Sequence, residues 1–237
     1  MGSIYLLTLR QLSGRWRLTI LTVLAALPVL ITWVTLHHSS APTVQDFEKI
    51  VYATLLAGAI MPLAVLAIGS AAFGNEVDDR TLANLTLAPI ARWQIVVPKL
   101  LATLTIATPF IAVSAGLVGW MAYLGDMKAV AAMVAASIAG VALYASAFLW
   151  LGLVTSQAIG IGLLYIVLWE GFFAGFVSGV RLLSIRHYAI ALMHGMDARR
   201  FADGTQVSPL AAAVVALVVF TGFVWLAVRR LRAMDVA

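Results

Sequence analysis

Six long apolar stretches alternate with short polar segments along the 237 residues of the chain. Each stretch is close to or above the ~20 residues that an α-helix needs to cross the hydrocarbon core of a bilayer. We therefore expect an all-α integral membrane protein that forms a single transmembrane domain over residues 1–237. The six predicted transmembrane helices are 18–36, 51–73, 95–124, 129–154, 158–178 and 209–228.

Two other segments are predicted to be helical without crossing the membrane. Residues 1–17 mix apolar side chains with three arginines, a pattern typical of an interfacial helix on the inner leaflet. A cleaved signal peptide is disfavoured because the apolar run that follows is long enough to span. Residues 179–208 are too apolar for a solvated linker, so we expect a short extracytoplasmic segment whose one or two helices lie on the outer leaflet or re-enter it.

The polar segment between the second and third spans, NEVDDRTLANLTLAPIARWQIVVPK, has the pattern of a short amphipathic helix over residues 76–88. Asn75 is a suitable N-cap, and the acidic residues that follow it suit the first turn of a helix. Leu82 and Leu85 share one face of this helix, and Pro89 should end it. The apolar face has no core of its own to cover, which favours a docking surface. A solvated loop with topogenic charges is the alternative.

Composition places the chain in the membrane. Hydrophobic residues make up 63% of the sequence and charged residues 11%, against about 25% charged residues in soluble domains. The net charge of +5 could indicate binding to nucleic acid. In a membrane protein, however, Lys and Arg hold cytoplasmic ends and contact anionic headgroups. We therefore expect the lipid bilayer as the partner of these charges, and no nucleic acid.

Six spans place both termini on the same side of the membrane. Nine Lys and Arg residues then fall on the side of the termini and six on the other side, four of them in the loop 179–208. The positive-inside rule favours cytoplasmic termini, although that loop argues against it. We expect a multi-pass protein of a bacterial inner (plasma) membrane, with the helix 76–88 in the cytoplasm.

Glu170 is the most informative single residue, because it is an acidic residue within the fifth predicted span. A carboxylate at that depth costs roughly 2.5–3.5 kcal/mol on insertion scales, so it must face a partner, a cavity or water. It is a candidate for the translocation path, and the alternative is a hydrogen-bonded glutamate that joins helices. Gly171, Gly175 and Gly179 repeat at four-residue spacing on the same span. This spacing lets a second helix approach closely, either in a dimer or within one subunit.

No motif for chemistry is present in the sequence. There is no GxxxxGK[ST] loop for ATP, no HExxH pair for zinc and no GxSxG nucleophile. The chain also has no cysteine. We therefore expect no catalytic residue, no metal site and no cofactor in this chain, and we expect a non-enzymatic subunit whose energy comes from elsewhere.

The polar segment resembles the cytoplasmic signature of ABC-2 type transporter permeases, the transmembrane subunits of ABC transporters with a type V exporter-like architecture. The family pattern has glycine where Arg80 stands here. The resemblance implies that residues 76–88 are a coupling helix that docks into an ATPase. The residues that match are Glu76-Val77-Asp78-Asp79-Arg80-Thr81-Leu82, then Leu85, Leu87, Pro89, Arg92, Ile95 and Lys99. The positions to which the resemblance gives an ATPase-coupling role are Glu76, Asp78, Asp79, Arg80, Thr81, Leu82, Leu85, Pro89 and Arg92.

The resemblance also implies partners. Two copies of a separate ABC ATPase subunit would bind ATP and magnesium, and a second permease chain would complete the pore, as a homodimer in the simplest case. The complex would be an exporter, or would signal across the membrane to an extracytoplasmic partner. Two other classes stay open: an ATP-independent channel or secondary carrier, and a membrane assembly scaffold. No constellation of residues identifies a substrate.

Overall fold

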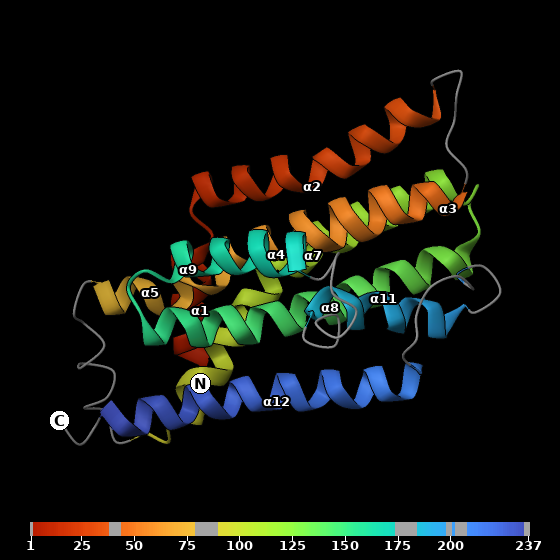
Figure 1. The fold of residues 1–237 in the computed structure, drawn as a ribbon. Coiled ribbons are helices and arrows are strands. Elements are labelled where there is room, and N and C mark those ends of the chain that lie inside the picture. Colours follow the sequence, from red (N-terminus) through yellow and green to blue (C-terminus); the bar gives the residue numbers. More distant parts are fainter. Residues whose placement is uncertain are drawn as a thin grey trace.

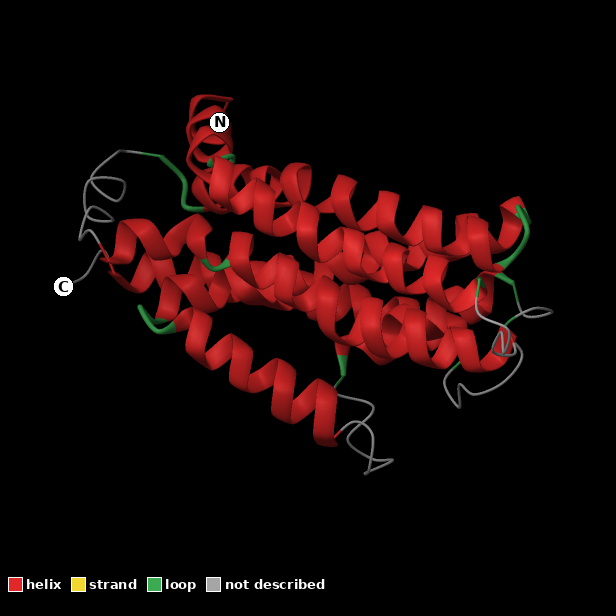
Figure 2. Ribbon diagram, turned by 90° about the horizontal axis from the view of Figure 1, so that it is seen from above, coloured by secondary structure: helices red, strands yellow, loops and turns green. Residues whose placement is uncertain are grey.

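The computed structural model is a bundle of helices (Figures 1 and 2). Among the described residues, five helical segments are long and apolar enough to cross a membrane, which confirms the prediction of an all-α membrane protein. They are α2 (Arg15–Leu36), the continuous run Glu48–Val77, α7 (Trp93–Ala122), α8 (Met127–Val154) and α12 (Pro209–Ala233). The structure describes residues 2–37, 44–78, 90–173, 184–197, 201 and 208–234.

The fifth predicted span is shorter in the described part of the chain than the sequence suggested. An apolar helix occupies Ala158–Phe172, where we expected a span over 158–178. It consists of α9 (Ala158–Leu164) followed by wide π-helical turns in η2 (Tyr165–Phe173). Residues 174–178 lie outside the described residues, so the count of six spans stays a prediction.

The second span is assembled from several consecutive pieces. A short helix, α3 (Val44–Phe47), leads into a π-helical segment, η1 (Glu48–Ile60). The chain then continues through α4 (Met61–Gly69) into α5 (Ala71–Asp78). The two π-helical segments, η1 and η2, pack against each other. Because π-helical turns are rare and gather at functional sites, this contact marks a region to examine.

Helix α8 is the centre of the bundle. In the most apolar 18-residue stretch of α8, 67% of the residues are buried, compared with 22% in the same stretch of α2 and 11% in that of α12. Helices α4, α5, α7, α11 and α12 all pack on it. The absence of a side chain at Gly152 permits a close crossing, because a Cβ there would collide with the carbonyl oxygen of Ser70. Figure 1 shows α2 and α12 at opposite edges of the bundle, where they cover little of it.

Helices α7 and α8 form a tight hairpin. Leu124 and Gly125 both have positive φ angles, 52° and 79°, and they reverse the chain. The side chain of Asp126 then caps α8 by accepting a hydrogen bond from the backbone N–H of Lys128 at 3.1 Å. The turn therefore sets two long helices side by side with no linker between them.

The N-terminal helix is shorter than predicted. Helix α1 (Gly2–Leu12) ends well before residue 17, because Gly14 is extended and the chain turns there into α2. Arg15 and Arg17 consequently belong to the first span. Helix α1 lies against α7, and the hydroxyls of Tyr5 and Thr105 are 3.0 Å apart. Figure 2 shows α1 turned away from the direction of the long helices.

The prediction that a new helix starts after Asn75 is wrong. Asn75 lies inside α5, so the helix of the second span continues to Asp78 without a cap at that point. The reason is a tertiary contact of Glu76, described below, which local capping rules do not include. The remainder of the predicted amphipathic helix, residues 79–88, lies outside the described residues.

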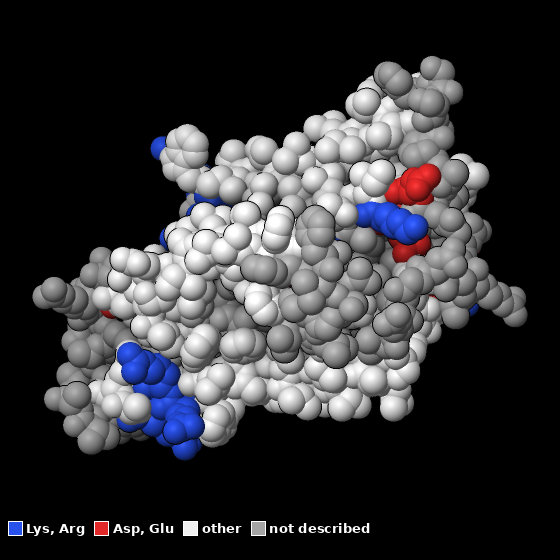
Figure 3. Space-filling model, in the orientation of Figure 1, with Lys and Arg blue, Asp and Glu red and all other residues white. Residues whose placement is uncertain are grey.

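The outer segment and the last span complete the fold. Helix α11 (Ile185–Met196) lies within the segment 179–208 for which we expected short helices, and Ser184 caps its N-terminus. Helix α12 extends beyond residue 228 to Ala233, with Arg230 and Arg232 in its last turn. Figure 3 shows Lys and Arg gathered at the end of the molecule where α12 finishes.

Candidate functional site

The end of α5 and the first turns of α7, which the sequence predicts on the cytoplasmic side, are joined by a buried ion pair that we call the inner junction. It consists of Glu76 and Lys99, whose Oε1 and Nζ atoms are 2.5 Å apart. Lys99 is 1% exposed and Glu76 is 6% exposed. The ammonium group also donates a hydrogen bond to the carbonyl of Ala72 and lies 4.7 Å from the ring centroid of Phe73. Every contact of this cation therefore ties α7 to α5.

Burial makes the inner junction dependent on both of its charges. Removing one partner of a buried pair leaves an uncompensated charge and typically costs about 3–5 kcal/mol. The second oxygen of Glu76, Oε2, is also buried and has no hydrogen-bond partner among the described residues. Lys99 is consequently the main compensation for the Glu76 carboxylate.

The turn between α1 and α2 is attached to the same region. The guanidinium of Arg17 donates to the backbone carbonyl of Gln11 at 2.9 Å and to the side-chain oxygen of Asn75 at 3.4 Å. One arginine therefore connects the end of α1, the start of α2 and α5. The inner ends of four helices are thus linked around the point where the chain leaves α5 and returns to α7.

The predicted coupling residues fall on both sides of this junction. Glu76 and Asp78 are in the last turn of α5, and Arg92 directly precedes α7. Of the predicted coupling residues, only Glu76 takes part in the ion pair. Its partner Lys99 belongs to the residues that match the family signature, but a contact between the two was not predicted. The others lie outside the described residues, and their role stays a prediction: Asp79, Arg80, Thr81, Leu82, Leu85 and Pro89.

Glu170 is completely buried within a cage of hydrogen-bond donors that we call the Glu170 cage. Its Oε1 accepts hydrogen bonds from the hydroxyls of Tyr144 at 2.9 Å and Tyr165 at 3.2 Å. Its Oε2 accepts one from the hydroxyl of Ser184 at 2.5 Å. The carboxylate therefore joins α8, η2 and the residue that caps α11.

The backbone of α11 completes the cage. The N–H groups of Ile185 and Arg186 point at Oε1 of Glu170, at 3.0 and 3.4 Å. These are the first N–H groups of the helix, which have no partner within it, and the positive end of the helix dipole favours an anion there. Glu170 thus fixes the N-terminus of α11 inside the bundle. These contacts are those of the helix-joining alternative, and a role in the translocation path stays a prediction.

The glycine face predicted on the fifth span is described only in part. Gly171 is exposed in η2, and among the described residues a Cβ there would meet only the backbone oxygen of Ile166, at 3.6 Å. Gly175 and Gly179 lie outside the described residues. The exposed position of Gly171 leaves room for a second helix, and packing in a dimer stays a prediction.

The other end of α11 is held by a hydrogen bond and an ion pair, which together we call the outer clasp. His194 Nε2 lies 2.6 Å from Oε1 of Glu48 at the start of η1, and its ring stacks on Phe201. Lys128 at the start of α8 lies 3.5 Å from the carboxylate of Asp197. No sequence pattern predicts the pair of His194 and Glu48, because 146 positions separate the two residues. Helix α11 is therefore attached to the bundle at both ends.

These clusters connect the ends of helices. The described residues contain no group of three or more His, Cys, Asp or Glu side chains able to hold a metal ion. The charged and polar contacts instead connect helix ends: α5 to α7 at the inner junction, and α11 to η1, η2 and α8 farther along the bundle. This arrangement suits transmission of motion between spans.

Comparison with known proteins agrees with this assessment. A family model described as "ABC-2 family transporter protein" matches residues 7–193, which is most of the chain and includes the inner junction and the Glu170 cage. No curated protein matches the sequence.

Proposed function

The chain belongs to the ABC-2 transporter family and is a membrane-spanning permease subunit of an ABC transporter, and from this premise we propose that it is an exporter subunit driven by a separate ATPase. Permeases of this family are membrane subunits that carry no chemistry themselves and act with an ABC ATPase. In the proposed complex two permease chains form a homodimer, and two ATPase subunits hold ATP and magnesium. ATP binding and hydrolysis there move the spans described here.

The observation that carries this proposal is the inner junction. Residues 79–89, which lie outside the described residues, connect α5 (Ala71–Asp78) along the chain to Arg92 and α7. The ends of these two helices are held together by the buried pair of Glu76 and Lys99. A force applied to the segment by a docked ATPase would therefore reach both spans as one unit. Flexible attachment would instead dissipate the force in local motion.

The charges support an orientation for the complex. Arg15 and Arg17 at the start of α2 and Arg230 and Arg232 at the end of α12 lie on helix ends of the same side as the inner junction. Basic residues favour the cytoplasmic side of an inner membrane. We place the segment 79–89 there, with both termini, where a cytoplasmic ATPase would reach it. Helix α11 and the outer clasp are then on the extracytoplasmic side, where an additional partner would bind.

The test is co-purification of the tagged chain from its native membrane in a mild detergent, followed by mass spectrometry. We expect an ABC ATPase to co-purify in stoichiometric amount with the unaltered chain. We expect this ATPase to be absent when Leu82 and Leu85 are both changed to Asp. Leu124→Asp is the matched control, because this exposed leucine lies in the hairpin between α7 and α8. A preparation without any ATPase, even after chemical cross-linking, would favour the channel, carrier or scaffold alternatives.

A further inference from the structure

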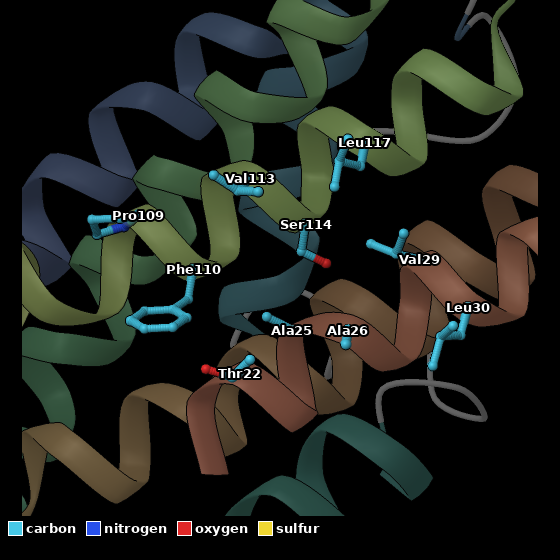
Figure 4. Close-up of a pocket in the computed structure, with 10 residues that line it drawn as sticks. All are labelled: Thr22, Ala25, Ala26, Val29, Leu30, Pro109, Phe110, Val113, Ser114 and Leu117. Carbon is cyan, nitrogen blue, oxygen red and sulfur yellow. The ribbon is translucent and has the colours of Figure 1, made fainter. Parts of the chain in front are cut away.

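An apolar groove of about 490 Å³ separates part of α2 from part of α7 (Figure 4). Its walls are Thr22–Leu30 and Pro109–Leu117. The volume is within the ~300–1,000 Å³ that small-molecule sites occupy. Among the lining side chains, all of them in the described part of the chain, only Thr22 and Ser114 carry a polar atom. The hydroxyl of Thr22 is already bonded to the carbonyl of Leu18, at 2.8 Å.

Ser114 differs from the other buried hydroxyl groups of the spans. It is 2% exposed, yet its Oγ has no hydrogen-bond partner among the residues that the structure describes. Figure 4 shows this hydroxyl directed across the groove toward α2. An unsatisfied buried hydroxyl is unfavourable, so the site lacks one acceptor. The buried hydroxyls that do bond back to a carbonyl three or four positions earlier are those of Thr32, Ser70, Thr103, Ser137 and Ser146.

The dimensions of the groove fit one leaflet of a bilayer. Each wall covers nine residues, which is about 12 Å along a helix. The hydrocarbon of one leaflet is about 15 Å thick, half of the ~30 Å core. An occupant of this shape is a single hydrocarbon chain that lies along the two helices.

The position of Ser114 indicates where that chain carries its polar atom. Helix α7 has 30 residues, so it is about 45 Å long and extends roughly 7 Å beyond the hydrocarbon core at each end. Ser114 lies about 12 Å from the end of the helix at Ala122, which is about 5 Å inside the boundary of the core. The ester carbonyl that joins the acyl chain of a glycerolipid to its headgroup lies just above this depth, and it is the hydrogen-bond acceptor of the lipid nearest to Ser114.

We infer that the groove between α2 and α7 is a binding site for the acyl chain of a membrane glycerolipid, whose ester carbonyl accepts a hydrogen bond from Ser114. The hydrocarbon tail lies between Ala26 and Val29 on one side and Phe110 and Val113 on the other. The site is formed within a single chain and does not rest on the proposed partnership with an ATPase.

The test uses a phosphatidylglycerol with a diazirine in one acyl chain, mixed into nanodiscs of unlabelled phosphatidylglycerol that contain the purified protein. After irradiation, peptide mass spectrometry locates the adducts. We expect them on Thr22–Leu30 and Pro109–Leu117, and we expect most of them to disappear in Ala26→Trp, which fills the groove. The matched control is Ala213→Trp, at an exposed position of α12 outside the groove, and it should keep them.

A second pair of variants tests the hydrogen bond. Ser114→Ala removes the unpartnered hydroxyl and should lower labelling at limiting probe concentration by about two- to tenfold, the range of one hydrogen bond. Ser146→Ala removes a buried hydroxyl that lies outside the groove and is already bonded to the carbonyl of Leu143, so it should leave labelling unchanged.

Three results would overturn the inference. The first is labelling spread evenly over all exposed helices. The second is equal labelling of the groove with and without Ala26→Trp. The third is occupation by a second copy of the chain. In that case Val113→Cys, the sole cysteine of the variant, would form a disulfide between two chains and the groove would give no lipid adduct.

Discussion

Glu76 and Glu170 are both buried carboxylates at helix junctions, and the bundle compensates their charges in different ways. Glu76 has one dominant partner, the ammonium of Lys99 at 2.5 Å. Glu170 accepts five hydrogen bonds from three hydroxyl groups and two backbone N–H groups. The first arrangement joins two helices at a point and fails when either charge is lost. The second fixes the start of a helix with several donors, and it should tolerate the loss of one.

The largest effect expected from this comparison is that of Lys99→Met. It leaves the Glu76 carboxylate buried without its cation, which should lower the free energy of unfolding by about 3–5 kcal/mol. The apparent melting temperature in detergent measures the loss, and Lys128→Met, at a largely exposed lysine, is the control. The double variant Glu76→Gln/Lys99→Met removes both charges and should recover most of the stability. A double variant as unstable as Lys99→Met would contradict the ion-pair account.

Glu170→Gln should have the next largest effect. The amide presents an NH₂ group where the cage supplies only donors, and the loss of charge-assisted bonds should cost about 1.5–3 kcal/mol. Hydrogen exchange should rise in Ile185–Met196, since α11 loses its N-terminal anchor, and should stay unchanged in α12. If exchange in α11 is unaltered while transport by the assembled complex changes, Glu170 acts in the translocation path and the anchoring role is wrong.

Tyr144→Phe removes one donor from the Glu170 cage and should cost less. The ring still stacks on Phe148, whose centroid is 5.7 Å away, so only the hydroxyl is lost. We expect a decrease of about 0.5–1.5 kcal/mol, the net value of one hydrogen bond. Tyr165→Phe should behave alike. If either substitution lowered the free energy of unfolding as much as Glu170→Gln, a single hydroxyl and not the set of donors would stabilise the carboxylate.

The smallest effect is expected from Lys128→Ala in the outer clasp. The lysine side chain is 66% exposed and its nitrogen is 3.5 Å from Asp197, so solvent screens the pair. The change in unfolding free energy should stay within about 1 kcal/mol. A larger loss in a thermal melt would mean that the clasp, and not the Glu170 cage, is the main attachment of α11.

The comparison also explains what could be predicted from the sequence. The long apolar runs predicted the five described helices that are long enough to cross a membrane, because bilayer thickness sets helix length independently of tertiary structure. The same reasoning showed that Glu170 needed a partner. Two of its partners, Tyr144 and Ser184, lie 26 and 14 positions away, and no periodic pattern identifies them.

The error at Asn75 has a related cause. Local capping chemistry favoured a helix start at that residue, and the rule considers only neighbours in the chain. The helix continues through it because Glu76 is held by Lys99, 23 positions later. The orphan hydroxyl of Ser114 could not be foreseen either, since serine is an ordinary residue in packed membrane helices.

The central claim is that the inner junction makes the ends of α5 and α7 move together when an ATPase acts on the segment between them. Because the chain has no cysteine, spin labels can be placed at Gly74→Cys, where the added side chain meets open space, and at the exposed Trp93→Cys. The distance between the labels is measured in the complex with ADP and with trapped ATP, alongside a reference pair at Leu124 and Leu210. In the unaltered junction we expect the reference distance to change with nucleotide and the distance between α5 and α7 to stay constant. In Glu76→Gln/Lys99→Met we expect the distribution of distances between α5 and α7 to become broad. A nucleotide-dependent change between α5 and α7 in the unaltered junction would contradict the account.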